Sequence, residues 1–526
     1  MPEFDVSGLD FTIAAVYILA VMGVGLWVSR SQSDTNSYFL GGRGAIWPVI
    51  GISMMSANLS GTSFVGLAGA GYEHGIAVWN YEWTATLVLI FFSLFILPIY
   101  LRSKVSTMPE FLEKRYDWRA RRVFAAFSVF TAIVIDSAGA LFAGSLTLSL
   151  LFPEVPLWTL IAIIAFLGGA YVIIGGLKAV MVTDTIQGVL LLSVGTIVFF
   201  MTYAQIGSWE GVKDAAPEGG FTILPPADDE FFPWPGIFTG AIWLSFYYWT
   251  TNQAVVQKVL AAKDANHGRW GLLLAAAIQL PFLFILVLPG VMGRDIFPDL
   301  QETDQIWPAL VFELLPQGLR GLALAALVAA LMSTVDSVLN ASASLVVNDF
   351  VKPIKKDLSD RRMLMISRAM VALFMVLAAL WAPVIGSFGG IVEYFQSFLG
   401  YVTMPVVVVF LGGVFWTRPP RNAAFWTLSI GVPVGIACFT VFEGLALFDL
   451  QFLYGTGLML VLNLGIFLTI TFRSQAPEEL SEDLTWSREN WRKDRKELQG
   501  KPMWQSHQLW SAVLVVVTLV MVCMFI

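Results

Sequence analysis

Apolar segments long enough to cross a lipid bilayer recur along the whole chain. About 20 apolar residues form a helix that spans the hydrocarbon layer, and backbone polar groups find no water there, so a spanning segment of this length is helical. Fourteen such segments are expected, at 9–29, 46–70, 78–101, 121–150, 157–175, 180–204, 234–256, 270–293, 317–348, 363–384, 388–416, 423–445, 451–472 and 507–526. Charged residues make up only 13% of the chain, against about 25% in soluble domains. The sequence predicts an all-α polytopic membrane protein with about 14 transmembrane helices.

The basic residues predict how these helices are oriented. Cytoplasmic loops collect Lys and Arg, and with the N-terminus placed outside, all but three of the 31 Lys and Arg fall on the cytoplasmic side or at its helix ends. The three exceptions are Lys213, Arg294 and Arg320. We therefore expect a multi-pass protein of the plasma (inner) membrane with both termini extracytoplasmic. The acidic N-terminus lacks a basic region, so no cleavable signal peptide is expected.

The number of helices predicts an internal repeat. Without the first helix and the last three, ten helices remain, five in 46–204 and five in 234–416. Two copies of a unit with an odd number of helices enter the membrane in opposite senses, which is the inverted-repeat plan of many secondary transporters, with the binding site at the midplane. The expected flanking parts are the first helix and loop at 1–45, an extracellular loop at 205–233, and the C-terminal helices at 417–526, which include a cytoplasmic segment at 473–506.

The apolar stretch Ile52–Tyr72 is interrupted by a polar and small-residue cluster at Ser56–Ser63. An interrupted spanning helix is tolerated where it lines a cavity, and its freed carbonyls can hold a cation. Close helix packing also enriches Gly, Ala and Ser. Both interpretations fit this stretch when it is considered alone.

Four carboxylates lie within predicted spans, namely Glu82, Asp136, Asp184 and Asp336. A charge at the bilayer centre costs about 2.5–3.5 kcal/mol on the insertion scale, so such a residue usually faces a cavity, a partner or an ion. The alternative is a hydrogen-bonded or protonated acid that joins helices. Asp136 fits this structural role best, because nothing around it suggests a ligand set.

Asp336 lies among hydroxyl groups. Ser333 and Ser337 are four residues apart and share one helix face, and Thr334 is adjacent to Ser333. Hydroxyls, carbonyls and one or two carboxylates suit a hard cation, although such hydroxyls also bond back to their own helix. Together with the interrupted stretch at Ser56–Ser63, this face favours a cation site.

Aromatic residues accompany polar groups at Asn80–Thr84 and at Ser245–Gln253. Such a combination suits a sugar, because the apolar ring face stacks on an aromatic side chain while the hydroxyls take hydrogen bonds. An interfacial aromatic belt has a similar composition. The position of Ser245–Gln253 in mid-helix favours a binding site.

Several longer motifs carry a family resemblance. They are Ser37–Arg43, Thr107–Tyr116, Gly175–Val180 with Thr183–Gln187, Leu324–Asn340 and Gly412–Trp416. With these motifs the chain resembles the sodium/solute symporter family, and within it the sodium/sugar (glucose/galactose-type) cotransporters. The resemblance implies a LeuT-type fold with a 5+5 inverted repeat and extra flanking helices. It also implies that the helices at 46–70 and 234–256 are discontinuous.

The resemblance implies an ion site, residue by residue. The expected sodium ligands are the carbonyls of Ser56, Leu59 and Ala330 and the hydroxyls of Ser333 and Thr334. Some members resemble a two-sodium pattern, for which Asp184 and Ser337 are present here, with Asp336 as an added carboxylate.

The resemblance also implies a substrate site and a gate. The matching substrate positions are Asn58, Ser63, Glu82, Thr84, Ser245, Gln279 and Gln396, with Tyr248 and Trp249 at the gate. Ser63, Ser245 and Gln279 replace a Gln, an Asn and a Lys of the galactose-type pattern. A hydrogen-bonding site discriminates strongly when one polar partner is missing, so these changes predict a specificity other than galactose. Glu82 favours a neutral sugar or polyol over an anion.

The sequence therefore predicts a sodium-coupled secondary active importer of a sugar that works by alternating access. Its expected partners are a small-molecule solute, sodium ions and the lipid bilayer, and no nucleic acid. No nucleophile–base or metal-ligand pattern predicts an enzyme. The alternatives are the same fold with another solute (inositol, an amino acid, a monocarboxylate or sialic acid) and a nutrient sensor that does not pump.

Overall fold

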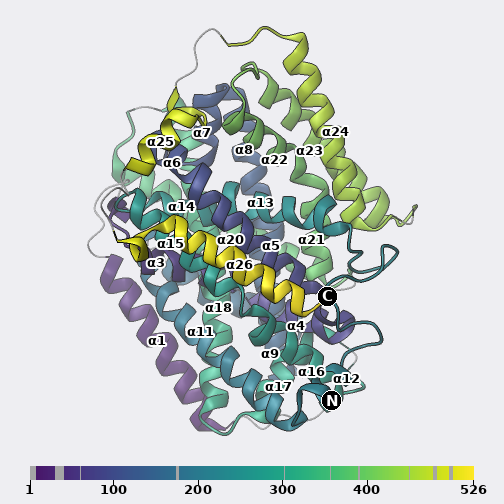
Figure 1. Ribbon diagram of the computed structural model, residues 1–526. Coiled ribbons are helices and arrows are strands. Elements are labelled where there is room, and N and C mark those ends of the chain that lie inside the picture. Colours follow the sequence, from purple (N-terminus) through teal and green to yellow (C-terminus); the bar gives the residue numbers. More distant parts are fainter. Residues whose placement is uncertain are drawn as a thin grey trace.

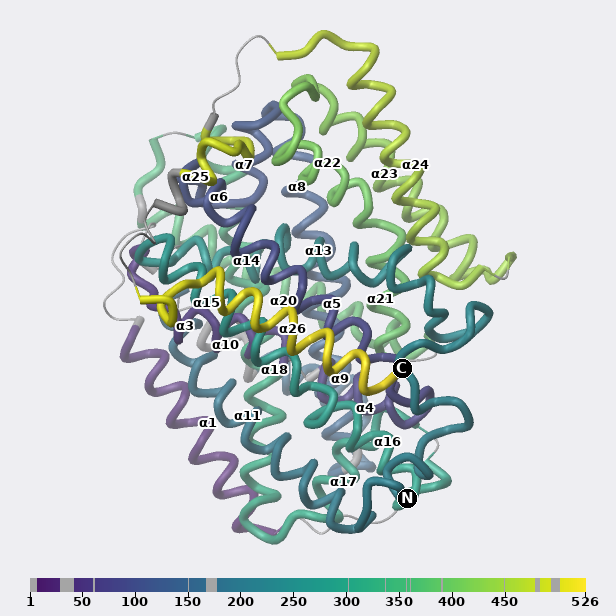
Figure 2. Tube along the Cα trace, viewed as in Figure 1, coloured from purple at the N-terminus to yellow at the C-terminus, as the bar shows by residue number. Residues whose placement is uncertain are grey.

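The computed structural model describes residues 7–29, 41–59, 61–172, 177–300, 302–355, 357–388, 391–448, 450–477, 482–496 and 502–526. The described residues are organised as helices, and their only isolated β-bridge joins Ala45 to Ala262. Figures 1 and 2 show a bundle in which most long helices run roughly along one direction. The predicted all-α fold is confirmed.

The helices up to residue 214 include the first broken span and a long straight helix, α11 (Figure 1). They are α1 (Gly8–Ser29), α3 (Trp47–Asn58), α4 (Gly61–His74), α5 (Asn80–Phe91), α6 (Leu97–Arg102), α7 (Met108–Arg115), α8 (Trp118–Thr131), α9 (Ala138–Leu151), α10 (Leu157–Val172), α11 (Leu177–Ile206) and α12 (Trp209–Asp214). Short 3-10 or π turns join some of them, namely η2 (Gly75–Trp79), η3 (Phe92–Ile96) and η4 (Ala132–Ser137).

The helices after residue 236 include the second broken span. They are η5 (Ile237–Ala241), α13 (Ile242–Thr251), α14 (Gln253–Leu260), α15 (Ala265–Gln279), η6 (Leu283–Val287), α16 (Leu288–Ile296), η7 (Thr303–Gln305), α17 (Ile306–Leu314), α18 (Leu319–Leu345), η8 (Val346–Val351), α19 (Lys352–Ile354), α20 (Asp360–Ile385), α21 (Ile391–Val402), α22 (Met404–Phe415), α23 (Ala423–Phe439), η9 (Thr440–Gly444), α24 (Phe452–Arg473), α25 (Arg488–Lys496) and α26 (His507–Met524).

The number of uninterrupted spans differs from the expected fourteen. Within the described ranges, nine helices are long and apolar enough to cross a membrane, or up to eleven when two bent pairs each count as one span. The expected spans at 46–70 and 234–256 are each broken into shorter helices. The one expected at 157–175 extends into residues 173–176, which are not described. The chain is a multi-pass membrane protein, and the count of fourteen is not confirmed.

Two spans are broken near their middle. α3 ends at Asn58, and Leu59 leaves the helical conformation with φ −70° and ψ 58° before α4 begins at Gly61. α13 ends at Thr251, and Asn252 is extended with ψ 124°. The Asn252 side chain accepts the Ala254 N–H at 2.9 Å and so caps α14. Each break frees backbone groups inside the bundle.

α18 forms the centre of the bundle. The most apolar part of its span is 88% buried, against 17% for α1 and 17% for α26. It packs against α11, α1 and α14, whereas α26 crosses the face of the bundle over α15 and α5 (Figure 2). The exposed apolar residues of α1 and α26 therefore suit contact with lipid.

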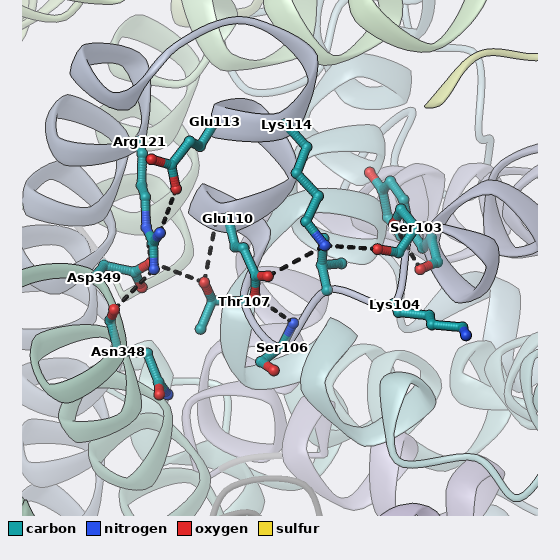
Figure 3. A network of polar contacts seen from close by, with 12 residues as sticks. Ser103, Lys104, Ser106, Thr107, Glu110, Glu113, Lys114, Arg121, Asn348 and Asp349 are labelled. Atoms are coloured by element: carbon teal, nitrogen blue, oxygen red, sulfur yellow. Dashed lines mark hydrogen bonds and ion pairs between the residues drawn. The ribbon is translucent and has the colours of Figure 1, made fainter. Parts of the chain in front are cut away.

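A polar network fixes α7 at one end of the bundle. Figure 3 shows Arg121 between Glu113 of α7 and Asp349 of η8. Arg121 Nε donates to Asp349 Oδ1 at 2.6 Å, and its Nη2 donates to the Asn348 carbonyl at 2.8 Å. The Thr107 hydroxyl donates to the same Asp349 oxygen at 2.9 Å. The network joins α7, α8 and η8.

The loop of residues 207–236 is closed by a residue from the far end of the sequence. Phe525 accepts the Ile223 N–H with its backbone carbonyl at 3.0 Å. Its ring lies 6.0 Å from Phe221, 6.4 Å from Trp209 and 6.1 Å from Trp79, between centroids. This aromatic cluster holds the loop, which includes α12, against η2.

Candidate functional site

A polar cavity lies where the two broken spans face each other. Its volume is about 140 Å³, against roughly 10–15 Å³ needed for one water molecule on the same measure, so it has room for a small solute. Its wall comes from the α3–α4 break, α5, η4, α13, α15, α18 and α21. The predicted substrate and gate residues on this wall are Asn58, Ser63, Glu82, Ser245, Tyr248, Trp249, Gln279 and Gln396.

Glu82 and Gln279 form the polar end of this wall. The Gln279 side-chain amide donates to the Glu82 carboxylate, which is only 7% exposed. Two other wall atoms, Gln279 Oε1 and the Tyr81 hydroxyl, are buried and have no hydrogen-bond partner within the described part of the chain. Buried polar atoms are nearly always satisfied. A solute that reached these two atoms would supply the partners that they lack.

The break in the first span brings Asn58 and Ser63 together. The Ser63 hydroxyl donates to the Asn58 carbonyl, across the residues that separate α3 from α4. A serine has a short side chain and can satisfy a nearby freed carbonyl, as hydroxyls commonly do at turns. Ser63 therefore stabilises the break as well as lining the cavity.

Thr84 does not line the cavity, contrary to the sequence prediction. Its hydroxyl is fully buried and lies within hydrogen-bond distance of the Asn80 carbonyl, at 2.7 Å, and of the Ser245 hydroxyl, at 3.1 Å. Because Ser245 is on the cavity wall, Thr84 supports it from behind. The gate residues Tyr248 and Trp249 contact each other nearly at right angles, with centroids 5.1 Å apart.

Asp136 is a wall residue that the sequence assigned to a purely structural role. It lies in the π turn η4 and lines both the central cavity and a second cavity of about 10 Å³. Asn252 and Gln253, at the break between α13 and α14, also line the second cavity. Asp136 thus separates two adjacent hollows beside a broken helix. The sequence feature that indicates this cavity-lining position is a carboxylate within a predicted membrane span.

The expected sodium ligands converge on the end of α3 and the middle of α18. The hydroxyls of Ser56 and Ser333 are 3.1 Å apart, and both residues are fully buried. Thr334 lines the central cavity and donates to the Ala330 carbonyl at 3.1 Å. Leu59 is the first residue beyond α3, where helix carbonyls lose their partners. These hydroxyl and carbonyl oxygens are ligands of the kind that a hard cation such as sodium prefers.

Asp184 of α11 orients this group. Ser333 donates its hydroxyl proton to Asp184 Oδ1 at 2.6 Å, so its oxygen lone pairs remain available as acceptors. Ser337 donates to Asp184 Oδ2 at 3.2 Å. Asp184 and Ser337, expected at a second ion position, are therefore together. The third expected member, Asp336, lies on α18, but its side chain is outside the described residues.

Lys258 is a residue of this cluster that the sequence prediction does not include. It was counted among the loop residues after 256, but α14 continues to Leu260 and carries Lys258 into the bundle. Its ammonium lies 2.7 Å from Asp184 Oδ2 and is fully buried. The available signal was Asn252, a good helix N-cap that predicts a helix over the following residues.

Among the described residues that line the central cavity, two have ionisable acid or base side chains of the Asp, Glu, Lys or Arg type, and both are acidic. Glu82 and Asp136 line the central cavity, and no Lys or Arg is among its described lining residues. An anionic solute would therefore meet like charge at this site, whereas a neutral hydroxyl-rich solute would find acceptors.

Three comparisons place the chain among known proteins. The model of the "Sodium:solute symporter family" matches residues 38–431. The chain is 32% identical over 466 residues to a sodium/glucose cotransporter of Vibrio parahaemolyticus, covering 82% of this chain and 86% of that protein. It is 34% identical over 480 residues to sodium/myo-inositol cotransporter 2 of Sus scrofa, covering 83% and 70%.

A solved structure shares the fold. A Na⁺-coupled sialic acid symporter in a substrate-bound outward-open state matches with a TM-score of 0.77 at 22% identity, covering 90% of this chain and 100% of that chain. At this identity the likeness shows the fold, and the predicted LeuT-type architecture is confirmed.

Proposed function

The chain belongs to the sodium:solute symporter family, and from this premise we propose that it imports a neutral sugar or polyol together with sodium by alternating access. The observation that carries this proposal is the cavity wall, where the buried Gln279 Oε1 and Tyr81 hydroxyl have no hydrogen-bond partner in the described ranges. A hydroxyl-rich solute supplies both the donors and the acceptors that these groups lack.

The acidic character of the cavity supports a neutral solute. Glu82 accepts from Gln279 with one carboxyl oxygen, and its second oxygen can accept a hydrogen bond from a solute. Asn58 and Gln396 add amides on the other walls. We assign these residues to solute binding, together with Ser63 and Ser245.

The oxygen cluster at the end of α3 supports sodium as the coupled ion. We assign the carbonyls of Ser56, Leu59 and Ala330 and the hydroxyls of Ser333 and Thr334 to this ion. Thr334 also lines the central cavity, so one residue of α18 touches both the ion position and the solute position. An inward membrane potential contributes about 2.3 kcal/mol per carried charge per 100 mV.

Alternating access follows from the two broken spans. The helices on either side of each break can tilt separately, because the break removes the continuous hydrogen-bonded ladder between them. We propose that α14 and the ring of Tyr248 move to release the solute towards the cytoplasm. We propose that the part of the protein that changes conformation consists of two inverted repeats, at 46–204 and at 234–416.

The proposed orientation follows the basic loops, with both termini extracytoplasmic in the plasma (inner) membrane. In this orientation α7 and the Arg121 network lie on the cytoplasmic side. The loop of residues 207–236 then lies outside. Cysteine labelling of Asp228→Cys and of Lys104→Cys in right-side-out vesicles, each in a background without the native cysteines, tests this. Reaction of position 228 alone with an impermeant reagent supports the orientation, and reaction of position 104 alone overturns it.

Counterflow in proteoliposomes tests the function. Purified protein is reconstituted into proteoliposomes in the presence of sodium. The proteoliposomes are preloaded in turn with glucose, galactose, myo-inositol, sialic acid or an amino acid. Sodium-dependent exchange of a labelled sugar or polyol is expected, with myo-inositol included because a relative at 34% identity carries that name. Exchange of sialic acid or an amino acid alone would overturn the assignment. Binding of a sugar without any concentrative uptake would instead indicate a sensor.

Ser333→Ala tests the ion assignment. It removes the hydroxyl that lies between Ser56 and Asp184, and sodium-dependent uptake is expected to fall by at least about tenfold, the equivalent of about 1.4 kcal/mol. Thr183→Val is the matched control, since Thr183 is buried on α11 and its hydroxyl bonds only the carbonyls of Ala179 and Val180. Equal sodium dependence in both variants would remove the ion assignment.

A further inference from the structure

The ammonium group of Lys258 lies against Asp184, one of the residues expected at a second ion position. Lys258 Nζ lies 2.7 Å from Asp184 Oδ2 and 2.8 Å from the Ser53 carbonyl oxygen. The side chains of Lys258 and Asp184 are both 0% exposed. A buried charge needs a partner of opposite charge and further hydrogen bonds, and these contacts supply both to each residue.

The Oδ2 oxygen of Asp184 has no coordination capacity left. Its Oδ2 accepts from the Ser53 hydroxyl at 3.1 Å, from Ser337 at 3.2 Å and from Lys258. Its Oδ1 accepts from Ser333 at 2.6 Å. Each oxygen of an ionised carboxylate offers about two lone-pair sites, so the three donors on Oδ2 leave it none, whereas Oδ1 has one donor. A sodium ion bound to Oδ2 would have to displace one of its donors, and an ion at either oxygen would lie beside a second positive charge.

We propose that the Lys258 ammonium is the built-in cation of the Asp184 pocket, so that the protein binds one sodium ion, at the Ser333 position, and none at Asp184 and Ser337. The inference rests on the proposed sodium coupling and adds its stoichiometry. Lys258 is covalently part of α14, so it neutralises Asp184 without being carried across the membrane. The hydroxyl of Ser333 remains oriented by Asp184 and serves the single ion.

The number of sodium ions bound to the wild-type protein is the first test. Equilibrium binding of ²²Na⁺ to purified protein at saturation is expected to give about one ion per chain, and the ratio of ²²Na⁺ to sugar uptake in proteoliposomes is expected to be about one. A count of two would overturn the proposal and leave sodium coupling intact. Absence of any sodium binding and of sodium-dependent uptake would overturn the coupling itself.

Lys258→Met is the second test. Without the ammonium, Asp184 is a buried anion among three hydroxyls, and a second sodium ion is expected to bind there. Bound ²²Na⁺ should rise from about one to about two per chain, and the rise in melting temperature with sodium concentration should steepen. An unchanged count of one in folded Lys258→Met would overturn the proposal.

Two matched variants separate charge from packing. Lys258→Arg keeps a cation beside Asp184 and is expected to bind about one sodium ion, as the wild type does. The double variant Lys258→Met/Asp184→Asn removes both charges and is also expected to bind about one. A second ion in the double variant would show that Asp184 does not hold it, which contradicts the proposal. If Lys258→Met does not fold, the wild-type count decides.

Discussion

Gln279 donates its side-chain amide to Glu82 on the wall of the central cavity and thereby joins α15 to α5. The amide nitrogen of Gln279 donates to the carboxylate. The amide oxygen of Gln279 is buried and has no hydrogen-bond partner in the part of the chain that the structure describes. The pair therefore presents a negative acceptor and an unused amide oxygen side by side. Both groups accept hydrogen bonds, so a solute that binds here must offer donors at adjacent positions, as the hydroxyls of a sugar do.

Glu82→Gln is expected to weaken solute binding by about 10- to 100-fold. A hydrogen bond to a charged group contributes about 1.5–3 kcal/mol, and the substitution removes the charge while it keeps the shape. The apparent affinity from sodium-dependent uptake measures the effect. Glu313→Gln is the control, because it makes the same chemical change at an exposed position on α17. A Glu82→Gln affinity equal to that of the control would remove Glu82 from the site.

Asp136→Leu is expected to impair release more than binding. Asp136 lines the central cavity and the smaller one beyond it, and an apolar side chain there would close a polar route between them. We expect sugar binding by thermal shift to change less than about threefold, while the uptake rate falls by at least about tenfold. Asp136→Asn, which retains hydrogen-bonding atoms, should keep more of the rate. Equal losses of binding and rate would indicate a role in folding or binding instead.

Arg121→Leu is expected to destabilise the folded protein by about 3–5 kcal/mol, because it leaves the fully buried Asp349 carboxylate without its positive partner. The double variant Arg121→Leu/Asp349→Leu should recover part of this loss. Arg122→Leu is the control, since Arg122 is exposed and stacks on the Trp118 ring at 4.7 Å. The free energy of unfolding in detergent measures all three. A double variant no more stable than Arg121→Leu would contradict the ion-pair account.

Asp304 makes the stability depend on pH. It lies in η7, between the membrane spans, and burial raises its pKa to about 7 from an ordinary value of 3.8, with the charges of Glu73, Glu302 and Glu393 adding to the shift. The folded protein thus binds more protons than the unfolded chain between these values. Stability is highest below the lower value and is lost as the pH rises through about 7.

Asp304→Asn is expected to flatten this pH dependence. The wild-type melting temperature should fall relative to the variant by about one to a few degrees between pH 5 and pH 8. His74 Nε2 lies 3.6 Å from Glu393 Oε1 and is retained in both proteins, so the difference between their curves reports Asp304. Asp228→Asn, at an exposed loop position, should follow the wild type. A wild-type curve parallel to that of Asp304→Asn would contradict the prediction.

The sequence predicted the broken spans better than it predicted the contacts across them. The Ser and Gly cluster after Ser56 indicated a helix break, because backbone groups freed there need a cavity or a partner, and the break is found at Leu59. The position of Thr84 behind Ser245 was not predictable, since Thr84 and Glu82 lie on the same helix and only tertiary packing decides which face of that helix meets the cavity.

Lys258 shows a second limit of the sequence. A lysine beside an apolar segment is expected in a cytoplasmic loop, and the helix boundary was placed two residues before it. Asp184, its partner, lies 74 positions earlier on another helix. The attraction between two buried charges outweighed the tendency of lysine to remain in water, and this depends on a distance that the sequence does not contain.

The contact between Phe525 and Ile223 has a consequence for the order of biosynthesis. Translation proceeds from the N-terminal end, so the loop of residues 207–236 leaves the ribosome some 300 residues before the phenylalanine that covers it. Until Phe525 is made, Trp79, Trp209 and Phe221 lack the ring that they share. Early helices can enter the membrane one after another, but this part of the molecule can complete its packing only after Phe525 has been synthesised.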